Sequence, residues 1–387
     1  MPRHYICGVV EGFYGRPWSL EQRRDLFRRL DKFGLNSYVY APKDDIKHRA
    51  LWRQLYVDEE IMNLRLLITS AKESNIKFYY AISPGLDIDY SSEEEIDRLK
   101  MKLDQVKSLG CDCFAVLFDD IEMTMSSTNK GQFRTYAEAQ AFVTNKLFEY
   151  LKEPDFLFCP TEYCESRCEP DLMNSEYLLA LGKYLNTNIE VLWTGPKVIS
   201  RLITVDHLDQ VCKIVGRRPV IWDNLFANDY DIMRRLFLGP FTGRPVAVKS
   251  RTNGFLLNPN CQYEANFTPL FTLAAWNVAL NDLPTSAATS AQNSSHKTSD
   301  DDFLEPGGEM KCGLDEIELP LSSMYNPESI FNRALEHWVT IAGVNRPAIF
   351  YKATPAATLP EEKMDAAPPG DIDGVSRAAF LSVAEKE

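Results

Sequence analysis

The chain has 387 residues, 45% of them hydrophobic, and 55 acidic against 42 basic side chains give a formal net charge of −13. This acidity, without a basic stripe, argues against nucleic acid or an anionic membrane surface as the main partner. No window holds the ~18 consecutive apolar residues of a membrane span, and no apolar targeting segment precedes the first strand-like stretch. We therefore expect a soluble, intracellular protein.

The first 280 residues alternate strand-like apolar runs with amphipathic helical ones. The predicted strands are Tyr5 to Tyr14, Ser37 to Ala41, Lys77 to Ile82, Cys113 to Phe118, Phe156 to Pro160, Ile189 to Thr194, Val220 to Asp223 and Phe255 to Leu257. The predicted helices are Ser19 to Phe33, Glu59 to Glu73, Ser92 to Leu109, Gln132 to Leu151, Glu176 to Leu185, Val205 to Val215, Tyr230 to Leu236 and Thr268 to Ala279.

This alternation predicts an α/β fold, a (β/α)8 barrel, with an open doubly wound sheet as the alternative. The third helix has a recognisable start, because Ser92 is followed by Glu93, Glu94 and Glu95, which suit a helix N-terminus. Such a barrel commonly fills ~250 residues. We place it at residues 1–282.

The composition changes after the barrel. Residues 283–324 are rich in Ser, Thr, Asn and Asp and lack periodicity, which predicts a disordered acidic linker. Residues 325–343 predict an amphipathic helix, capped by Asn326 and carrying an apolar stripe that needs a partner, either the barrel or a second chain. Residues 344–387, rich in Ala and Pro, predict a loose tail.

Nine cysteines, an odd number without framework spacing, are interpreted as reduced thiols. Cys164 and Cys168 lie four residues apart, but no second pair of Cys or His completes a zinc site. We expect no metal there.

The fourth predicted strand runs directly into Asp119 and Asp120. In a parallel barrel the carboxyl ends of the strands open into the active site, so paired carboxylates there favour chemistry. Two acids in a confined site divide into an acid and an anion, as glycoside hydrolysis requires. Neighbours on a strand point to opposite faces, however, so both reach one substrate only if the backbone turns. The alternatives are a helix N-cap at Asp120, or magnesium ligands formed with Glu122.

Polar and aromatic residues follow the other strands as well. Aromatic faces pack on a sugar ring while carboxylates and amides bind its hydroxyls, and Trp222 beside Asn224 is the clearest such pair. Each segment alone could be turn chemistry, and Trp222 could be a core residue. Their repetition at one end of the barrel favours a sugar site.

These motifs together resemble one family, the eukaryotic protein O-GlcNAcases of glycoside hydrolase family 84. The resemblance spans residues 5 to 280 and rests on the segments Gly8 to Trp18, Tyr40 to Asp45, Ala81 to Asp87, Leu117 to Asp120, Cys159 to Cys164, Leu192 to Pro196, Trp222 to Asn224, Ala227 to Tyr230 and Asn258 to Cys261.

The resemblance implies hydrolysis of N-acetylglucosamine from Ser and Thr of nuclear and cytoplasmic proteins. The sugar's own acetamide would attack the anomeric carbon and form an oxazoline, a recognised exception to the two-carboxylate scheme. Asp119 would stay ionised and orient the acetamide, and Asp120 would be the general acid and then the base. The implied substrate-binding residues are Gly12, Lys43, Tyr163, Trp222, Asn224, Asp229 and Asn258. No metal or cofactor is implied.

The resemblance also implies a longer helical stalk, which helps to form the family's dimer and peptide cleft. Here the chain stops after one helix that resembles its start. Two other functions therefore stay open: a non-catalytic binder of modified proteins, and a hexosaminidase acting on other N-acetylhexosaminides. A homodimer through the last helix is a further expectation.

Overall fold

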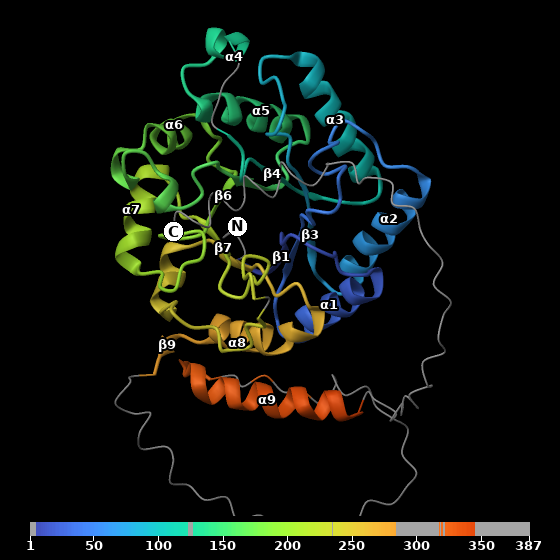
Figure 1. Cartoon of the computed structure of the whole chain (residues 1–387), viewed down its shortest axis with the longest axis vertical. Coiled ribbons are helices and arrows are strands. Elements are labelled where there is room, and N and C mark those ends of the chain that lie inside the picture. Colours follow the sequence, from blue (N-terminus) through green and yellow to red (C-terminus); the bar gives the residue numbers. More distant parts are fainter. Residues whose placement is uncertain are drawn as a thin grey trace, which may run out of the picture.

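The computed structural model describes residues 5–122, 127–233, 235–283, 317, 319 and 322–344. Its centre is a closed barrel of eight parallel strands in sequence order, in which the last strand pairs with the first (Figure 1). This confirms the predicted barrel and excludes the open sheet. The strands are β1 (Ile6–Glu11), β2 (Ser37–Tyr40), β3 (Lys77–Ile82), β4 (Cys113–Leu117), β5 (Asp155–Cys159), β6 (Glu190–Trp193), β7 (Val220–Asp223) and β8 (Gly254–Leu257).

The strands are apolar on both faces because both faces are covered. Along β4, Cys113, Ala115 and Leu117 belong to the core inside the barrel, and Phe114 and Val116 to the core between the sheet and the surrounding helices. The sequence of β4 therefore reads as one continuous apolar run.

A ring of helices surrounds the strands (Figure 1). They are α1 (Leu20–Lys32), α2 (Asp58–Glu73), α3 (Glu93–Ser108), α4 (Ser127–Gln132), α5 (Tyr136–Tyr150), α6 (Glu176–Tyr184), α7 (Val205–Val215) and α8 (Phe267–Val278). The predicted cap of α3 is confirmed, since the Ser92 side chain accepts a hydrogen bond from the Glu95 backbone. The helix predicted from Gln132 begins at Tyr136, where Thr135 forms the cap.

The helix predicted for Tyr230 to Leu236 is wrong: the described residues there form turns and irregular backbone. The carboxylate of Asp231 accepts from the backbone N–H of Arg235 at 2.6 Å and also pairs with its guanidinium. Such side-chain bonds to nearby backbone compete with the helix ladder. A 3-10 helix, Val246–Arg251, lies instead before β8.

The C-terminal helix α9 (Pro327–Val344) packs along α8 on the outside of the barrel (Figure 1). Asn326 caps it by accepting from the Ser329 N–H, as predicted. Ile330, Ala334 and Ile341 are buried on its apolar face, and two short strands, β9 (Asn281–Asp282) and β10 (Met324–Tyr325), pair in parallel beside it. Of the two partners considered for this stripe, the structure therefore supplies the barrel.

The predicted linker at 283–324 and tail at 344–387 lie almost wholly outside the described residues. Within the described part of the chain, no helix combines the length and the hydrophobicity needed to cross a membrane.

Candidate active site

A pocket of about 340 Å³, its open mouth included, lies where the carboxyl ends of the strands meet. Its walls come from residues that follow β1, β2, β4, β5, β6 and β7. The lining residues are Gly12, Tyr14, Lys43, Asp119, Asp120, Cys159, Tyr163, Thr194, Trp222, Asn224 and Tyr230. The predicted site residues thus gather here; Asp229 and Asn258 are not among the lining residues but bond directly to two of them, Tyr14 and Asn224.

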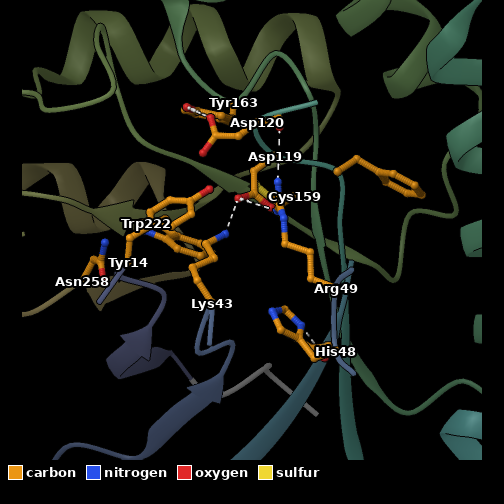
Figure 2. Close-up of polar contacts among 12 residues, drawn as sticks. Tyr14, Lys43, His48, Arg49, Asp119, Asp120, Cys159, Tyr163, Trp222 and Asn258 are labelled. Atoms are coloured by element: carbon orange, nitrogen blue, oxygen red, sulfur yellow. Dashed lines mark hydrogen bonds and ion pairs between the residues drawn. The ribbon is translucent and has the colours of Figure 1, made fainter. Parts of the chain in front are cut away.

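Asp119 is buried and faces two cations. Lys43 Nζ lies 2.7 Å from Asp119 Oδ2, and Arg49 Nη1 lies 3.7 Å from the same oxygen, as Figure 2 shows. Burial alone would raise the pKa of Asp119, but the charges of Lys43 and Arg49 outweigh it and hold the pKa well below its ordinary range. Asp119 is therefore an anion at neutral pH.

Asp120 leaves the strand in the left-handed region, with φ +49°. This is the backbone turn that lets two adjacent carboxylates line one pocket. Its Oδ1 accepts from the Tyr163 hydroxyl at 2.8 Å and from Arg167 Nη2 at 2.9 Å. Among the described residues the Asp120 side chain binds these two groups and no backbone N–H, so the N-cap alternative finds no support there.

The magnesium alternative also finds no support in the geometry. The cations beside Asp119 are those of Lys43 and Arg49, and Glu122 is exposed at the surface. Among the described residues there is no group of three or more His, Cys, Asp or Glu side chains placed to hold a metal ion.

Trp222 and Asn224 form one hydrogen-bonded unit with Asn258. Asn224 Oδ1 accepts from Trp222 Nε1 at 3.0 Å and from Asn258 Nδ2 at 2.9 Å, while its Nδ2 donates to the Val198 carbonyl at 2.8 Å. The amide carries two hydrogens, and the second one on Asn224 Nδ2 finds no acceptor among the described residues. Trp222 belongs both to the core inside the barrel and to the lining of the pocket, so the structure agrees with the core interpretation and with the pocket-wall interpretation.

Gly12 is required by this arrangement. A Cβ at this position would lie 2.2 Å from the ring of Trp222, much closer than any real contact. The indole therefore packs directly on backbone, and Gly12 sets the shape of the pocket wall.

Asp229 lies next to the lining residue Tyr14, whose N–H donates to Asp229 Oδ2 at 2.8 Å. Burial raises the pKa of Asp229 to about 6, against the opposing effect of its backbone hydrogen bonds. Three buried acceptors, Asp119 Oδ1, Asp229 Oδ1 and Asn258 Oδ1, receive no hydrogen bond from the described residues. An unsatisfied buried oxygen costs about 1–3 kcal/mol, so these atoms favour a ligand that brings N–H and O–H donors.

Two arginines of the site were not predicted. Arg49 Nη2 donates to the Asp120 carbonyl at 3.2 Å while Nη1 faces Asp119, so this one side chain holds both acids in place. Arg167 pairs with Asp120. Neither stands directly at a strand end, and no local sequence signal marks them.

Cys164 and Cys168 are both buried. Cys168 Sγ donates to the Cys164 carbonyl at 3.4 Å, across the short 3-10 helix η1 (Glu165–Arg167). Their spacing is therefore that of a tight turn.

Comparisons with known proteins agree with this geometry. The model of the beta-N-acetylglucosaminidase family matches residues 7–305. Protein O-GlcNAcases of Mus musculus and Rattus norvegicus are each 47% identical over 353 residues, which cover 88% of this chain, whereas the chain spans only 37% of their length. A mutant of the Thermobaculum terrenum O-GlcNAc hydrolase has a similar structure, with a TM-score of 0.72 at 31% identity, covering 88% of this chain and 64% of that chain.

Proposed function

Because the chain belongs to the beta-N-acetylglucosaminidase family, we propose that it is a retaining glycoside hydrolase that removes O-linked N-acetylglucosamine from Ser and Thr by substrate-assisted catalysis. One observation carries the proposal. A carboxylate kept ionised by Lys43 and Arg49 stands beside a second carboxylate, Asp120, whose Oδ2 has no donor among the described residues, and both line the same pocket.

Asp119 acts on the acetamide. Its Oδ2 pairs with Lys43, and its Oδ1 has no donor among the described residues, so Oδ1 accepts the acetamide N–H. As the acetamide oxygen attacks the anomeric carbon, positive charge develops on the amide, and a fixed anion stabilises it. No protein nucleophile is then needed.

Asp120 moves the proton. Its Oδ1 is taken by Tyr163 and Arg167, whereas no described residue donates to Oδ2. Oδ2 gives its proton to the leaving serine or threonine oxygen and later takes one from the water that opens the oxazoline. Tyr163 fixes the rotation of the carboxyl group and so aims Oδ2.

The other residues bind the sugar. Trp222 forms the wall, and the free N–H of Asn224 donates to the substrate. The unsatisfied oxygens of Asp229 and Asn258 accept from sugar hydroxyls, with the backbone of Gly12 close by. Lys43 has donors left after its pair with Asp119, and one of them reaches a hydroxyl.

The relatives named above point to the substrates. We propose that this chain acts on O-GlcNAc-modified proteins of the cytoplasm and nucleus, where we also place the chain itself. A homodimer through α9 remains part of the proposal and needs the face of that helix that does not pack on α8, where Val339 is 69% exposed.

The test is hydrolysis of two glycosides of N-acetylglucosamine, one with an activated aryl leaving group and one with a serine peptide. We expect Asp120→Asn to lose at least ~100-fold more activity on the peptide than on the aryl glycoside, because only the peptide oxygen needs an acid. Asp119→Asn should be severe on both substrates.

Asp112→Asn is the control, since Asp112 is exposed at the opposite end of the same strand and pairs only with Lys72 among the described residues. Equal losses on both substrates in Asp120→Asn would contradict the acid role. A folded wild-type chain that binds the sugar tightly without turnover would favour the binding-module alternative, and a preference for free oligosaccharides would favour the hexosaminidase.

A further inference from the structure

Arg167 is not among the residues that line the pocket, but it pairs with Asp120, which does line it. Its Nη2 donates to Asp120 Oδ1 at 2.9 Å, and its guanidinium lies 4.5 Å from the centre of the Tyr163 ring. The side chain is 22% exposed, and its Nε receives no partner among the described residues. One anion, Asp120, is thus its only ion-pair partner in the described part of the chain.

The turn that carries Arg167 is fixed in place. The N–H of Glu165 donates to the Gly195 carbonyl at 3.1 Å, and that of Ser166 to the Pro196 carbonyl at 3.0 Å. Glu165 itself pairs with His207, whose Nε2 accepts from Trp193 Nε1. Glu165 and Glu169 both lie two positions from Arg167 along the chain, and within the described residues Asp120 alone forms an ion pair with it.

The catalytic cycle disturbs this pair. The site holds three cations, Lys43, Arg49 and Arg167, around the two catalytic carboxylates. When Asp120 takes up the proton that it must deliver, its carboxyl becomes neutral and Arg167 keeps only a weak acceptor. Three cations then face one anion, Asp119, so the guanidinium of Arg167 has a charge to offer to another anion.

The position of Arg167 shows which part of a substrate could correct this imbalance. The leaving oxygen must lie within hydrogen-bond reach of the Asp120 carboxyl, so groups beyond Asp120 border the polypeptide and not the sugar. Arg167, partly exposed and attached to Asp120, is such a group. A guanidinium with free donors binds carboxylates and phosphates best.

Building on the proposed function, we propose that Arg167 forms an anion subsite on the polypeptide side of the pocket and selects substrates with an acidic residue or a phosphate next to the modified serine or threonine. The substrate anion takes over the ion pair with Arg167, and Asp120 is then free to hold its proton.

The test compares three glycopeptides that differ only at the two residues flanking the glycosylated serine: Gln, the isosteric Glu, and phosphoserine. Wild-type kcat/KM should be about five- to twentyfold higher for Glu than for Gln, as for one charge-assisted contact. In Arg167→Gln this ratio should fall to about one, and in Arg167→Lys to an intermediate value. Added salt should lower the wild-type ratio. The phosphoserine peptide shows whether phosphate or carboxylate is preferred.

The Glu-to-Gln ratio of kcat/KM is taken within each variant, so an effect of the substitution on the rate of hydrolysis itself cancels. Arg28→Gln is the matched control, since Arg28 is an exposed arginine on α1 whose loss changes the net charge equally. A wild-type ratio near one, or a ratio that survives in Arg167→Gln, would overturn the subsite. Hydrolysis of an aryl glycoside is measured beside the peptides. If the aryl glycoside is hydrolysed and the Glu and Gln peptides have equal kcat/KM, the anion subsite alone is refuted. If the aryl glycoside is not hydrolysed, the proposed function is refuted as well.

Discussion

Replacing Lys43 with Met tests the central electrostatic argument, that protein cations keep Asp119 ionised. Lys43 and Asp119 are 3% and 9% exposed, and their charges lie 2.7 Å apart. The substitution keeps a similar chain length but removes the nearer cation, so that only Arg49, at 3.7 Å, still faces the carboxylate.

The size of the effect follows from burial. Breaking a buried ion pair by removing one partner costs about 3–5 kcal/mol, which at ~1.4 kcal/mol per unit raises the pKa of Asp119 by about 2–4 units. Burial, which opposes ionisation, then meets only one cation. Asp119 should titrate within the range of an ordinary assay.

The assay is kcat against pH on an aryl glycoside, since kcat reports the groups of the bound complex and is less affected by Asp229. Wild type should keep its activity to low pH, whereas Lys43→Met should lose activity at a clearly higher pH than wild type as the pH falls. Lys43→Arg should restore the profile. Lys47→Met is the control, because Lys47 pairs with Glu60 outside the pocket.

The pH dependence of thermal stability tests the Lys43→Met substitution in a second way. A carboxyl whose folded-state pKa is depressed stabilises the fold above its unfolded pKa and loses that contribution as the pH falls. The Tm of Lys43→Met should therefore lie below wild type at pH 7, and the gap should shrink towards pH 3. A Lys43→Met enzyme with wild-type pH dependence of kcat would refute the assigned role of Lys43.

Two other substitutions follow from the site. In Asp229→Asn, a carboxyl whose pKa burial raises to about 6 is removed. An acid whose pKa is raised by folding destabilises the protein only at a pH at which it ionises. The Tm of Asp229→Asn should therefore exceed that of wild type at pH 8, by the equivalent of about 3 kcal/mol or less, and match it near pH 4, while the affinity for N-acetylglucosamine falls. An unchanged Tm at pH 8 would contradict this expectation. In Gly12→Ala, the new Cβ would displace the ring of Trp222, so kcat/KM should drop at least tenfold while the Tm changes little. Steady-state kinetics and thermal melts of the variant beside wild type measure both.

Much of the fold could be predicted because local patterns decide it. β3 and β7 have the predicted bounds, and Ser92 and Asn326 cap their helices as expected. Strand periodicity and cap residues act over a few positions, which a single sequence displays directly. The wrong helix prediction for Tyr230 to Leu236 also has a local cause. The composition there favours a helix, but the Asp231 side chain bonds to the backbone and guanidinium of Arg235 instead.

For the site, the sequence predicts which residues are present but not how they contact one another. Residues at strand ends could be predicted, since the barrel brings every strand end to one place. The contacts among them could not, because Lys43 and Asp119 are 76 positions apart and Arg167 and Asp120 are 47 apart. Arg49 was missed for this reason, since it lies in the loop after β2 and its function comes only from what it meets.

The left-handed backbone at Asp120 decides which inactive variants are informative. Asn and Asp tolerate positive φ, whereas Ala pays a cost there of order 1 kcal/mol. Asp120→Asn thus removes the proton donor from an otherwise unstrained turn, while Asp120→Ala would also shift the peptide whose carbonyl Arg49 holds. An alanine scan would assign to chemistry a loss that belongs partly to the backbone, and a substrate-trapping reagent built from this chain should carry Asn at this position.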